Sequence, residues 1–325
     1  MVKRIAVMTT GGDAPGMNAA IRGVVRTAIG LGMEVYGIEE GFSGLLQNMF
    51  KKMESYSVSN IVNKGGTILR TVRSKDFRLP EKRKEAYSFL KRNLIEGLVV
   101  IGGDGSRMGA YTVTKETGLP TVFIPASIDN DVYGTDFTIG FDTAVNVALE
   151  AIDKIRDTAA SHERVFIVEL MGREHGFLTL ECGITGGAEI ILIPEFKKDF
   201  NLLKIANSLQ AGIKRGKSSS IIVMAEGLGS GIDFAVKLEK KLGFEVRCSV
   251  LGYIQRGGTP TARSRKLGLS FGYNAVKLIK KMKTGESKMV GIQGEKIVIH
   301  EMKDVTGKER DIDKDSYEMN KIFSL

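Results

Sequence analysis

Short apolar runs rich in β-branched residues recur along this chain, and most are followed by glycine or a polar turn and then by a segment with helical spacing. The clearest runs are residues 5–9, 98–101, 121–124, 165–170, 190–193, 221–225 and 249–254. The helical segments are residues 19–31, 81–92, 143–158, 202–214, 234–242 and 267–283. This alternation predicts parallel strands joined by crossover helices. Because most runs are apolar throughout, we expect strands that are covered on both faces.

The length of 325 residues is sufficient for two domains of ordinary size. A hydrophobic content of 42% and a charged content of 26% are ordinary for globular proteins and exclude a disordered, collagenous or coiled-coil chain. Both halves use the same strand–turn–helix order, and no Pro- or Ser-rich linker separates them. We therefore predict an α/β protein with a domain boundary near Gly140.

Lys and Arg exceed Asp and Glu by 47 to 38, which could indicate nucleic-acid binding. The basic residues are scattered beside acids, however, and the chain has no Trp and no zinc-finger spacing, so small anionic ligands explain the excess better. No stretch approaches the roughly 20 apolar residues of a membrane span. Two cysteines, Cys182 and Cys248, are too few for a disulfide framework. We expect a cytoplasmic protein without a nucleic-acid or membrane partner.

Ligands of open α/β sheets bind beyond the carboxyl ends of the strands. After the first strand, residues 10–16 read Thr-Gly-Gly-Asp-Ala-Pro-Gly, and a helix follows. After the second, residues 102–106 read Gly-Gly-Asp-Gly-Ser. Such glycines let backbone N–H groups approach a phosphate. A carboxylate among them suits a Mg²⁺–nucleotide complex, so Asp104 is the metal candidate, with capping of the next helix as its alternative role.

Two familiar nucleotide-binding motifs do not fit. Gly216-Lys217-Ser218 resembles the end of a P-loop, but Ala211 stands where that motif needs glycine, and the segment follows a helix. The Gly103-x-Gly105 pair lacks the third glycine of the dinucleotide fingerprint. Hydrolase and zinc motifs built on histidine are also missing from the sequence.

The third strand end carries two carboxylates, Asp129 and Asp131, separated by one amide. One carboxylate can accept a substrate proton while the other organises a metal or nearby cations. A solvated Asx-rich turn is the alternative interpretation. Arginines recur at other strand ends, and their planar forks suit phosphate, while a glutamate there can accept hydrogen bonds from sugar hydroxyls.

Five segments, taken together and in order, resemble the bacterial-type, ATP-dependent 6-phosphofructokinase family (phosphofructokinase A). They are residues 10–18, 102–106, 128–131, 171–173 and 255–258, and the resemblance covers nearly the whole chain. It implies two similar parallel-sheet, three-layer α/β domains and a homotetramer. The implied nucleotide domain is residues 1–139 with about 254–304, and the implied sugar-phosphate domain is residues 140–253 with about 305–325.

The resemblance also implies a reaction: the γ-phosphoryl group of Mg-ATP moves to the 1-hydroxyl of fructose 6-phosphate, giving fructose 1,6-bisphosphate and ADP, the committed step of glycolysis. Asp129 looks like the base, Arg173 offsets charge on the transferred group, and Asp104 holds Mg²⁺ with Asp131 nearby. The residues matching the nucleotide site are Gly12, Arg73, Ser74, Gly103, Asp104, Gly105 and Ser106. Those matching the sugar-phosphate site are Ser127, Ile128, Asp129, Arg164, Met171, Gly172, Arg173, Glu226, Arg247, Tyr253, Ile254, Gln255 and Arg256, with Arg164 and Arg247 supplied by a neighbouring subunit.

Members of this family bind an anionic effector at a second interface. The matching residues are Arg22, Arg26, Arg156, Gly187, Glu189, Arg215 and Lys217. Ser55, Asn60 and Ser218-Ser219 depart from the usual residues, so we expect weakened or altered control by ADP and phosphoenolpyruvate.

The phosphoryl donor is the main alternative. Pyrophosphate-using relatives typically carry Asp in place of Gly105 and Lys in place of Ala126, so both residues here favour ATP, whereas Ser74 replaces a common aromatic residue beside the adenine. Tyr253 replaces a common His at the sugar-phosphate site. A noncatalytic paralogue that senses sugar phosphate or nucleotide is a further alternative, and the intact Asp104, Asp129 and Arg173 count against it.

Overall fold

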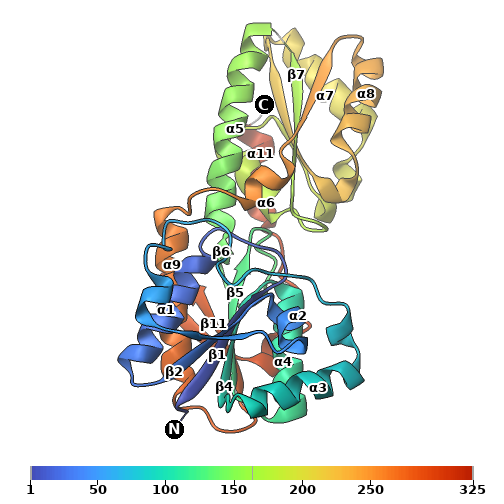
Figure 1. Ribbon diagram of the computed structural model, residues 1–325. Coiled ribbons are helices and arrows are strands. Elements are labelled where there is room, and N and C mark those ends of the chain that lie inside the picture. Colours follow the sequence, from blue (N-terminus) through green and yellow to red (C-terminus); the bar gives the residue numbers. More distant parts are fainter. Residues whose placement is uncertain (1, 163, 324–325) are drawn as a thin grey trace. The chain divides into compact units, whose positions relative to one another are not determined.

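The computed structural model describes residues 2–162 and 164–323, which form two compact units. The first unit comprises Met1–Thr143 and Arg256–Arg310, and the second comprises Ala144–Gln255 and Asp311–Leu325. Each has a largely parallel sheet with helices on both faces, which confirms the predicted α/β fold (Figure 1). The assignment of nucleotide and sugar phosphate to separate domains stays a prediction. None of the helices in the described residues is long and apolar enough to cross a bilayer.

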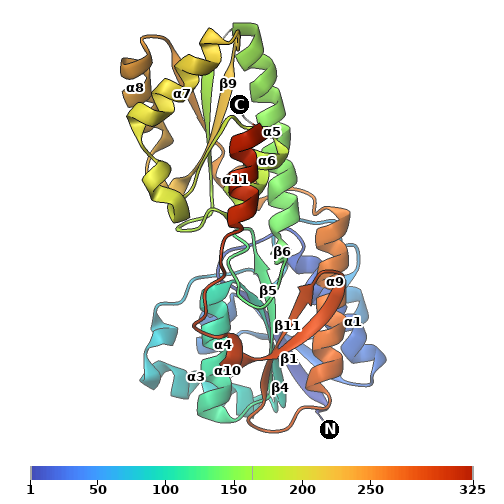
Figure 2. The same cartoon turned by 180° about the vertical axis from the view of Figure 1, so that it is seen from behind.

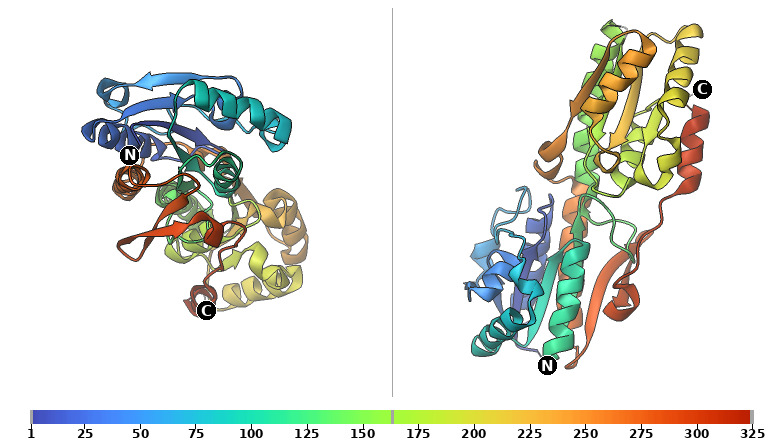
Figure 3. Two further views of the ribbon diagram at one scale, coloured as in Figure 1. Left: turned by 90° about the horizontal axis from the view of Figure 1, so that it is seen from below. Right: turned by 90° about the vertical axis from the view of Figure 1, so that its right-hand side faces the viewer.

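The first unit is built on an eight-stranded sheet with the order β12-β11-β5-β4-β1-β2-β3, in which β6 also pairs with β5. The pairs that join β2, β1, β4, β5 and β11 are parallel, whereas β3 and β12 pair antiparallel at the two edges (Figure 3, right). Its strands are β1 (Arg4–Thr10), β2 (Glu34–Ile38), β3 (Phe50–Met53), β4 (Gly97–Gly102), β5 (Thr121–Ser127), β6 (Ile139–Gly140), β11 (Ser287–Gln293) and β12 (Lys296–Glu301). Its helices are α1 (Met17–Gly30), α2 (Gly41–Leu46), α3 (Pro80–Arg92), α4 (Asp104–Thr117), α9 (Ala262–Ile279) and α10 (Met302–Val305), with short 3₁₀ turns η1 (Ser55–Val58) and η2 (Asp76–Arg78).

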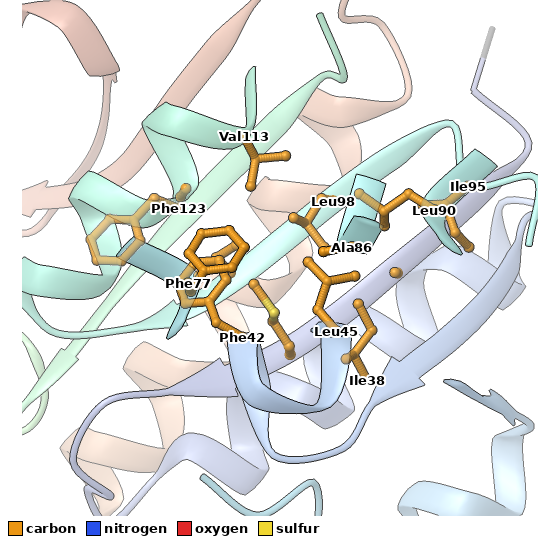
Figure 4. Packing of buried hydrophobic residues seen from close by; sticks show 14 of the residues in the cluster. Ile38, Phe42, Leu45, Phe77, Ala86, Leu90, Ile95, Leu98, Val113 and Phe123 are labelled. Atoms are coloured by element: carbon orange, nitrogen blue, oxygen red, sulfur yellow. The ribbon is translucent and has the colours of Figure 1, made fainter. Parts of the chain in front are cut away.

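The core on one face of this sheet lies beneath α2, α3 and α4. Side chains from β1, β2, β4 and β5 meet Phe42, Leu45, Leu90 and Val113 from the helices above (Figure 4). The rings of Phe42 and Phe77 stack with their centroids 4.1 Å apart. Helices α1 and α9 cover the other face (Figure 1). This coverage explains why the strand sequences are apolar without alternation.

The second unit has a four-stranded parallel sheet with the order β10-β7-β9-β8. Helices α7 and α8 pack on one face, and α5, α6 and α11 lie on the other side, with α11 beside α6 and β8 (Figure 2). Its elements are β7 (Val165–Leu170), α6 (Phe177–Thr185), β8 (Ile190–Leu192), η3 (Pro194–Asp199), α7 (Leu202–Lys214), β9 (Ser220–Ala225), η4 (Glu226–Leu228), α8 (Gly231–Leu242), β10 (Val246–Val250) and α11 (Lys314–Phe323). Helix α5 (Phe141–His162) and the 3₁₀ turn η5 (Gly252–Arg256) run across the boundaries between the units.

The prediction of a strand over residues 249–254 was wrong. The strand is Val246–Val250, and η5 follows it. Gly252 has a φ of 52°, in the left-handed region, which ends the extended backbone. The charged Arg247 interrupts the apolar pattern at the true start of the strand, where it pairs with Phe166.

Helix α9 begins five residues before its predicted start at 267, because the Thr261 hydroxyl accepts a hydrogen bond from Ser264 N and caps the helix. The predicted strands 5–9, 98–101, 165–170, 190–193 and 221–225 are confirmed to within one residue at each end, and the strand predicted over 121–124 continues three residues further, to Ser127. Strands β2, β3, β11 and β12 were missed, since polar residues and glycine interrupt their apolar patterns.

We predict that Gly272→Ala destabilises the first unit, because α1 and α9 approach each other closely at this residue. A Cβ at position 272 would lie 2.6 Å from Ala20 O and 2.7 Å from Val24 N, both backbone atoms that cannot rotate away. Overpacking of this kind costs about 1–3 kcal/mol, and each kcal/mol lowers Tm by roughly 2–4 °C in a unit of this size. Gly30→Ala is the matched control, since a Cβ there meets nothing within 4 Å among the described atoms. A thermal melt in which both variants unfold like the wild type would contradict the prediction.

Candidate active site

Three loops of the first unit begin at the same level of the sheet. Strands β1, β4 and β5 are neighbours, and the register pairs Thr10 with Gly102 and Gly102 with Pro125. The segments that follow these strands, residues 11–16, 103–106 and 128–131, therefore emerge side by side at the carboxyl edge of a parallel sheet. The sequence had predicted this meeting of the three motifs from their strand-end positions alone.

The glycines after β4 have different roles. A Cβ at Gly102 would clash with the Thr10 carbonyl oxygen and lie 2.5 Å from Ser106 Oγ, so the packing of the protein itself requires glycine there. The Ser106 hydroxyl donates to Thr10 O at 3.0 Å and ties the second loop to the first. A Cβ at Gly103 would meet its nearest atom only at 3.8 Å, and one at Gly105 meets no described atom within 4 Å. The protein's own packing does not explain Gly103 and Gly105, whereas a phosphate lying against the backbone does.

The first loop is contacted by an arginine from the last position of η5. Arg256 Nη1 donates to Asp13 O at 3.1 Å, and a Cβ on Gly12 would clash with the same guanidinium. Gly11 has a φ of 91°, which favours glycine. The structure thus places Arg256, predicted for the sugar phosphate, against Gly12, predicted for the nucleotide.

Hydrogen bonds hold the carboxylate loop after β5 in a single conformation. Asn130 has a φ of 53°, and its Oδ1 accepts from Thr138 N at 2.9 Å while its Nδ2 donates to Asp136 O at 3.0 Å. The Ser127 hydroxyl accepts from Asp129 N at 3.1 Å. Asp129 is 3% exposed, and Ile128 is fully buried beneath it. These hydrogen bonds fix the backbone from which the buried Asp129 side chain extends.

Asp104 and Asp131 provide carboxylate oxygens that suit a hard divalent cation. Asp104 is the first residue of α4, and its carboxylate forms an ion pair with Arg107 one turn later instead of capping the helix. Within the described part of the chain, Asp131 Oδ1 is buried and has no hydrogen-bond partner. Mg²⁺ prefers such oxygens and usually keeps waters and phosphate oxygens as its other ligands. No group of three or more acidic, Cys or His side chains gathers within residues 2–162 and 164–323.

The other two residues predicted for the nucleotide lie in the loop between η1 and η2. Arg73 is exposed, whereas the Ser74 hydroxyl accepts from Phe77 N at 3.2 Å at the start of η2. Ser74 therefore has a structural role in this turn.

In the second unit, the carboxyl ends of β7 and β9 bring Met171, Gly172, Arg173 and Glu226 together. The register pairs Leu170 with Ala225, directly before these residues. Glu226 Oε1 accepts from Arg173 N at 2.8 Å and Gly172 N at 3.3 Å. Arg173 has a φ of 54°, an uncommon conformation for a residue with a side chain, and one that concentrates at functional sites.

The residues predicted around η5 differ in burial. Gln255 is fully buried, and its Oε1 accepts from Met171 N at 2.9 Å. Tyr253 and Ile254 are 82% and 58% exposed. Gln255 thus supports the backbone of the 171–173 loop, and the two exposed side chains are available to a ligand or a neighbouring chain.

Arg164 and Arg247 lie at the opposite end of the same sheet. Arg164 Nε is 2.6 Å from Glu245 Oε2, and Arg247 forms an ion pair with the other oxygen of that carboxylate. Six residues separate Arg164 from Leu170, and at roughly 3.3 Å per residue this distance is about 20 Å. One copy of the second unit therefore presents two separate groups of predicted sugar-phosphate residues. Glu245, which joins the two arginines, was not recognised from the sequence.

Five of the predicted effector residues lie in the second unit. Arg156 Nη2 donates to Gly186 O at 2.6 Å and Gly187 O at 2.8 Å, and Lys217 Nζ is 3.5 Å from Glu189 Oε1. A pocket of about 310 Å³ is lined by Glu189, Arg215 and side chains of α7 and α11. Arg22 and Arg26 lie on α1 of the first unit, where Arg22 donates to Val58 O at 2.6 Å.

Glycine loops and paired carboxylates at the carboxyl ends of parallel strands define a class of α/β proteins that bind phosphorylated ligands. The family model described as Phosphofructokinase matches residues 4–279. The chain is 51% identical to the ATP-dependent 6-phosphofructokinase of Halalkalibacterium halodurans and 49% identical to that of Bacillus subtilis, each over 324 residues and the full length of both proteins. This chain belongs to the phosphofructokinase family.

Solved structures agree with this assignment. Phosphofructokinase from Saccharomyces cerevisiae has a TM-score of 0.88 and 33% identity, over 93% of this chain and 44% of the yeast chain. A pyrophosphate-dependent phosphofructokinase from Marinobacter aquaeolei has a TM-score of 0.84 over 97% of this chain and 88% of its own, but at 22% identity it supports the fold alone.

Proposed function

We propose that this protein phosphorylates the 1-hydroxyl of fructose 6-phosphate with the γ-phosphoryl group of ATP, which yields fructose 1,6-bisphosphate and ADP, the committed step of glycolysis. The full-length similarity to ATP-dependent 6-phosphofructokinases carries this proposal. The rigid carboxylate loop beside two glycine loops adds independent support, since phosphoryl transfer depends on alignment and charge compensation. A cytoplasmic location is part of the proposal, because both substrates are intracellular metabolites.

In this reaction Asp129 accepts the proton of the attacking hydroxyl, and the Ser127 hydroxyl, which accepts the Asp129 N–H, anchors the backbone of that residue. Asp104 and Asp131 would hold Mg²⁺ through their free carboxylate oxygens. When bound, Mg²⁺ withdraws charge from the β- and γ-phosphates. The backbone at Gly103 and Gly105 leaves room for those phosphates, and Arg173 offsets negative charge on the transferred group.

The donor is ATP rather than pyrophosphate in this proposal. A Cβ built on Gly105 would meet no described atom within 4 Å, so the space beside this residue is open. Ala126 is small and 1% exposed. An Asp at position 105 or a Lys at position 126 would fill this space or alter its charge, as the family resemblance predicts for pyrophosphate-using relatives. A noncatalytic sensor of sugar phosphate is less well supported, because it would not need the constrained Asp129 loop.

We further propose that the sugar-phosphate site is shared between subunits of a homotetramer. By the strand spacing, Arg164 lies roughly 23 Å from Met171, and Arg247, which is level with Phe166, lies roughly 16 Å from it, so a single small ligand cannot contact both groups of one chain. A neighbouring subunit that supplies the two arginines resolves this separation. Glu245 holds the two arginines together and offsets one of their two positive charges until a sugar phosphate replaces it as their anionic partner.

An anionic effector site is the last part of the proposal. The Arg156, Glu189 and Lys217 cluster supplies cations and one carboxylate, and the pocket that contains Glu189 and Arg215 adds space. Regulation by ADP or phosphoenolpyruvate, and its predicted weakening by Ser55, Asn60 and Ser218, stays a prediction.

A coupled assay of fructose 6-phosphate with ATP, GTP and pyrophosphate in turn tests the proposed reaction. We expect turnover with ATP, and at least tenfold less with pyrophosphate, since the open space at Gly105 fits a longer donor. Faster turnover with pyrophosphate would overturn the choice of donor. Turnover with none of the three would overturn the reaction itself.

Asp129→Asn should lower kcat on the order of 10²–10⁴-fold while the binding of fructose 6-phosphate stays nearly unchanged, because the carboxylate acts on a proton in the transition state. Steady-state kinetics and equilibrium binding of the sugar phosphate measure the two effects. Asp304→Asn, an exposed substitution on α10, serves as the control and should keep wild-type kcat. Near-normal turnover of Asp129→Asn would remove this residue from the role of base.

Arg164→Ala should raise KM for fructose 6-phosphate far more than KM for ATP, since it removes a charge-assisted contact to the sugar phosphate. If the site is shared, co-folding of Arg164→Ala chains with Asp129→Asn chains should produce hybrids that are more active than either parent. Arg263→Ala, a basic residue stacked on Phe137 in the first unit, is the control for loss of charge. Hybrids no more active than their parents would argue against the shared site.

A further inference from the structure

Arg107 is a buried cation that the proposed reaction does not use. Its side chain is 1% exposed, in contrast to the 52% exposure of the Asp104 side chain with which it pairs. Arg107 Nη1 donates to Tyr133 O at 3.1 Å, and Nη2 donates to Asp104 and to Lys308 O at 3.2 Å. The Arg107 Nε is buried and has no hydrogen-bond partner among the described residues. A guanidinium kept from water in this way requires nearby negative charge.

The negative charge near Arg107 comes from the two carboxylates assigned to the metal. Burial lowers the pKa of Arg107, and the charges of Asp104 and Asp131 oppose this effect. Arg310 approaches the same loop from the chain after α10, where its Nη1 donates to Asn130 O at 2.9 Å. Burial also lowers the pKa of Arg310, against the charges of Asp136 and Asp131. Arg107 and Arg310 therefore balance the charges of Asp104 and Asp131.

We propose that Arg107 is a positioning residue that serves as the counter-ion of Asp104 and Asp131 in the protein without nucleotide. Its charge lowers the affinity of the two carboxylates for a free divalent cation. The cation therefore binds together with nucleotide phosphates. This inference rests on the proposed function, because it assumes that the two carboxylates hold the metal. The positive charge of Arg107 contacts Asp104 and acts on Asp131, so it repels a divalent cation that approaches these carboxylates. This repulsion is strongest where water is excluded. Phosphate oxygens from a nucleotide would restore the missing negative charge.

A purely structural role is the alternative. Arg107 could simply fasten α4 to the backbone at Tyr133 and Lys308, and its loss would then loosen this part of the unit without raising metal affinity. Charge and hydrogen bonding can be separated by substitution. Arg107→Met and Arg107→Gln both remove the charge, and Gln keeps a donor for a backbone carbonyl, while Arg107→Lys keeps the charge and loses the planar fork.

The test is a titration of the full-length protein with Mn²⁺ in the absence of nucleotide, with free Mn²⁺ measured by its electron paramagnetic resonance signal. We expect weak binding by the wild type and by Arg107→Lys, and at least tenfold tighter binding by Arg107→Met and Arg107→Gln. Arg83→Met is the matched control, since Arg83 pairs with Glu116 at 2.6 Å on another part of the unit, and it should bind Mn²⁺ like the wild type. Adding Asp104→Asn to Arg107→Met should abolish the gain, which assigns the gain to this site.

The inference would be overturned if folded Arg107→Met and Arg107→Gln bound Mn²⁺ as weakly as the wild type or more weakly. It would also be overturned if Arg107→Lys bound Mn²⁺ as tightly as these two variants. Circular dichroism establishes folding, and the Gln variant retains the test if the Met variant does not fold. The titration requires no turnover, so its outcome is separate from that of the donor assay. If the wild type phosphorylates fructose 6-phosphate but the Arg107 variants bind Mn²⁺ no more tightly, only the role of Arg107 is contradicted. If the variants bind Mn²⁺ more tightly but the wild type shows no turnover, only the proposed reaction is contradicted.

Discussion

The parallel register of β1, β4 and β5 is the constraint on which the proposed site depends. It places Thr10, Gly102 and Pro125 at one level, so that three loops distant in sequence begin together. Gly102 and the Ser106 hydroxyl then press the second loop against the Thr10 carbonyl, where no side chain would fit. The positions of the two glycine loops and of Asp104 follow from this register and packing.

Charge balance is a second theme of the structure. Ion pairs neutralise several of the residues assigned to anionic ligands: Glu245 pairs with Arg164 and Arg247, and Glu189 with Arg156 and Lys217. The first unit shows the reverse arrangement, in which Arg107 pairs with Asp104 and the positive charge of Arg310 acts on Asp131, the two carboxylates proposed to hold the metal. In each case an oppositely charged side chain of the protein lies beside these residues, so the ligand-free protein avoids the free-energy cost of unpaired charges. Ligand binding then becomes an exchange of partners, which favours ligands that bring a complete set of charges.

Much of the fold could be predicted from the sequence because buried parallel strands have continuous apolar runs, as in β4 and β9. Strands such as β11, which carries Lys288 and Gly291, could not be recognised because their burial depends on neighbours elsewhere in the chain. The candidate loops were recognisable as motifs at strand ends. Their hydrogen bonds to Thr138 and Gln255, and the ion pair with Glu245, depend on tertiary contacts that no local pattern encodes. Arg107 did carry a signal, since it follows Asp104 by three residues on a helix, a spacing at which side chains meet.

Helix α11 has a consequence for how the second unit can associate. Strand β8 is at the edge of its sheet, yet Tyr317 donates to Ile191 O at 3.4 Å and Asn320 to Ala188 O at 3.3 Å. Phe196 stacks on the Tyr317 ring with the centroids 4.1 Å apart and holds it in place. A strand from another molecule would have to displace these side chains before it could extend the sheet. The Tyr317 and Asn320 side chains thus oppose the pairing of a further strand at this edge and so act against open-ended β-sheet growth.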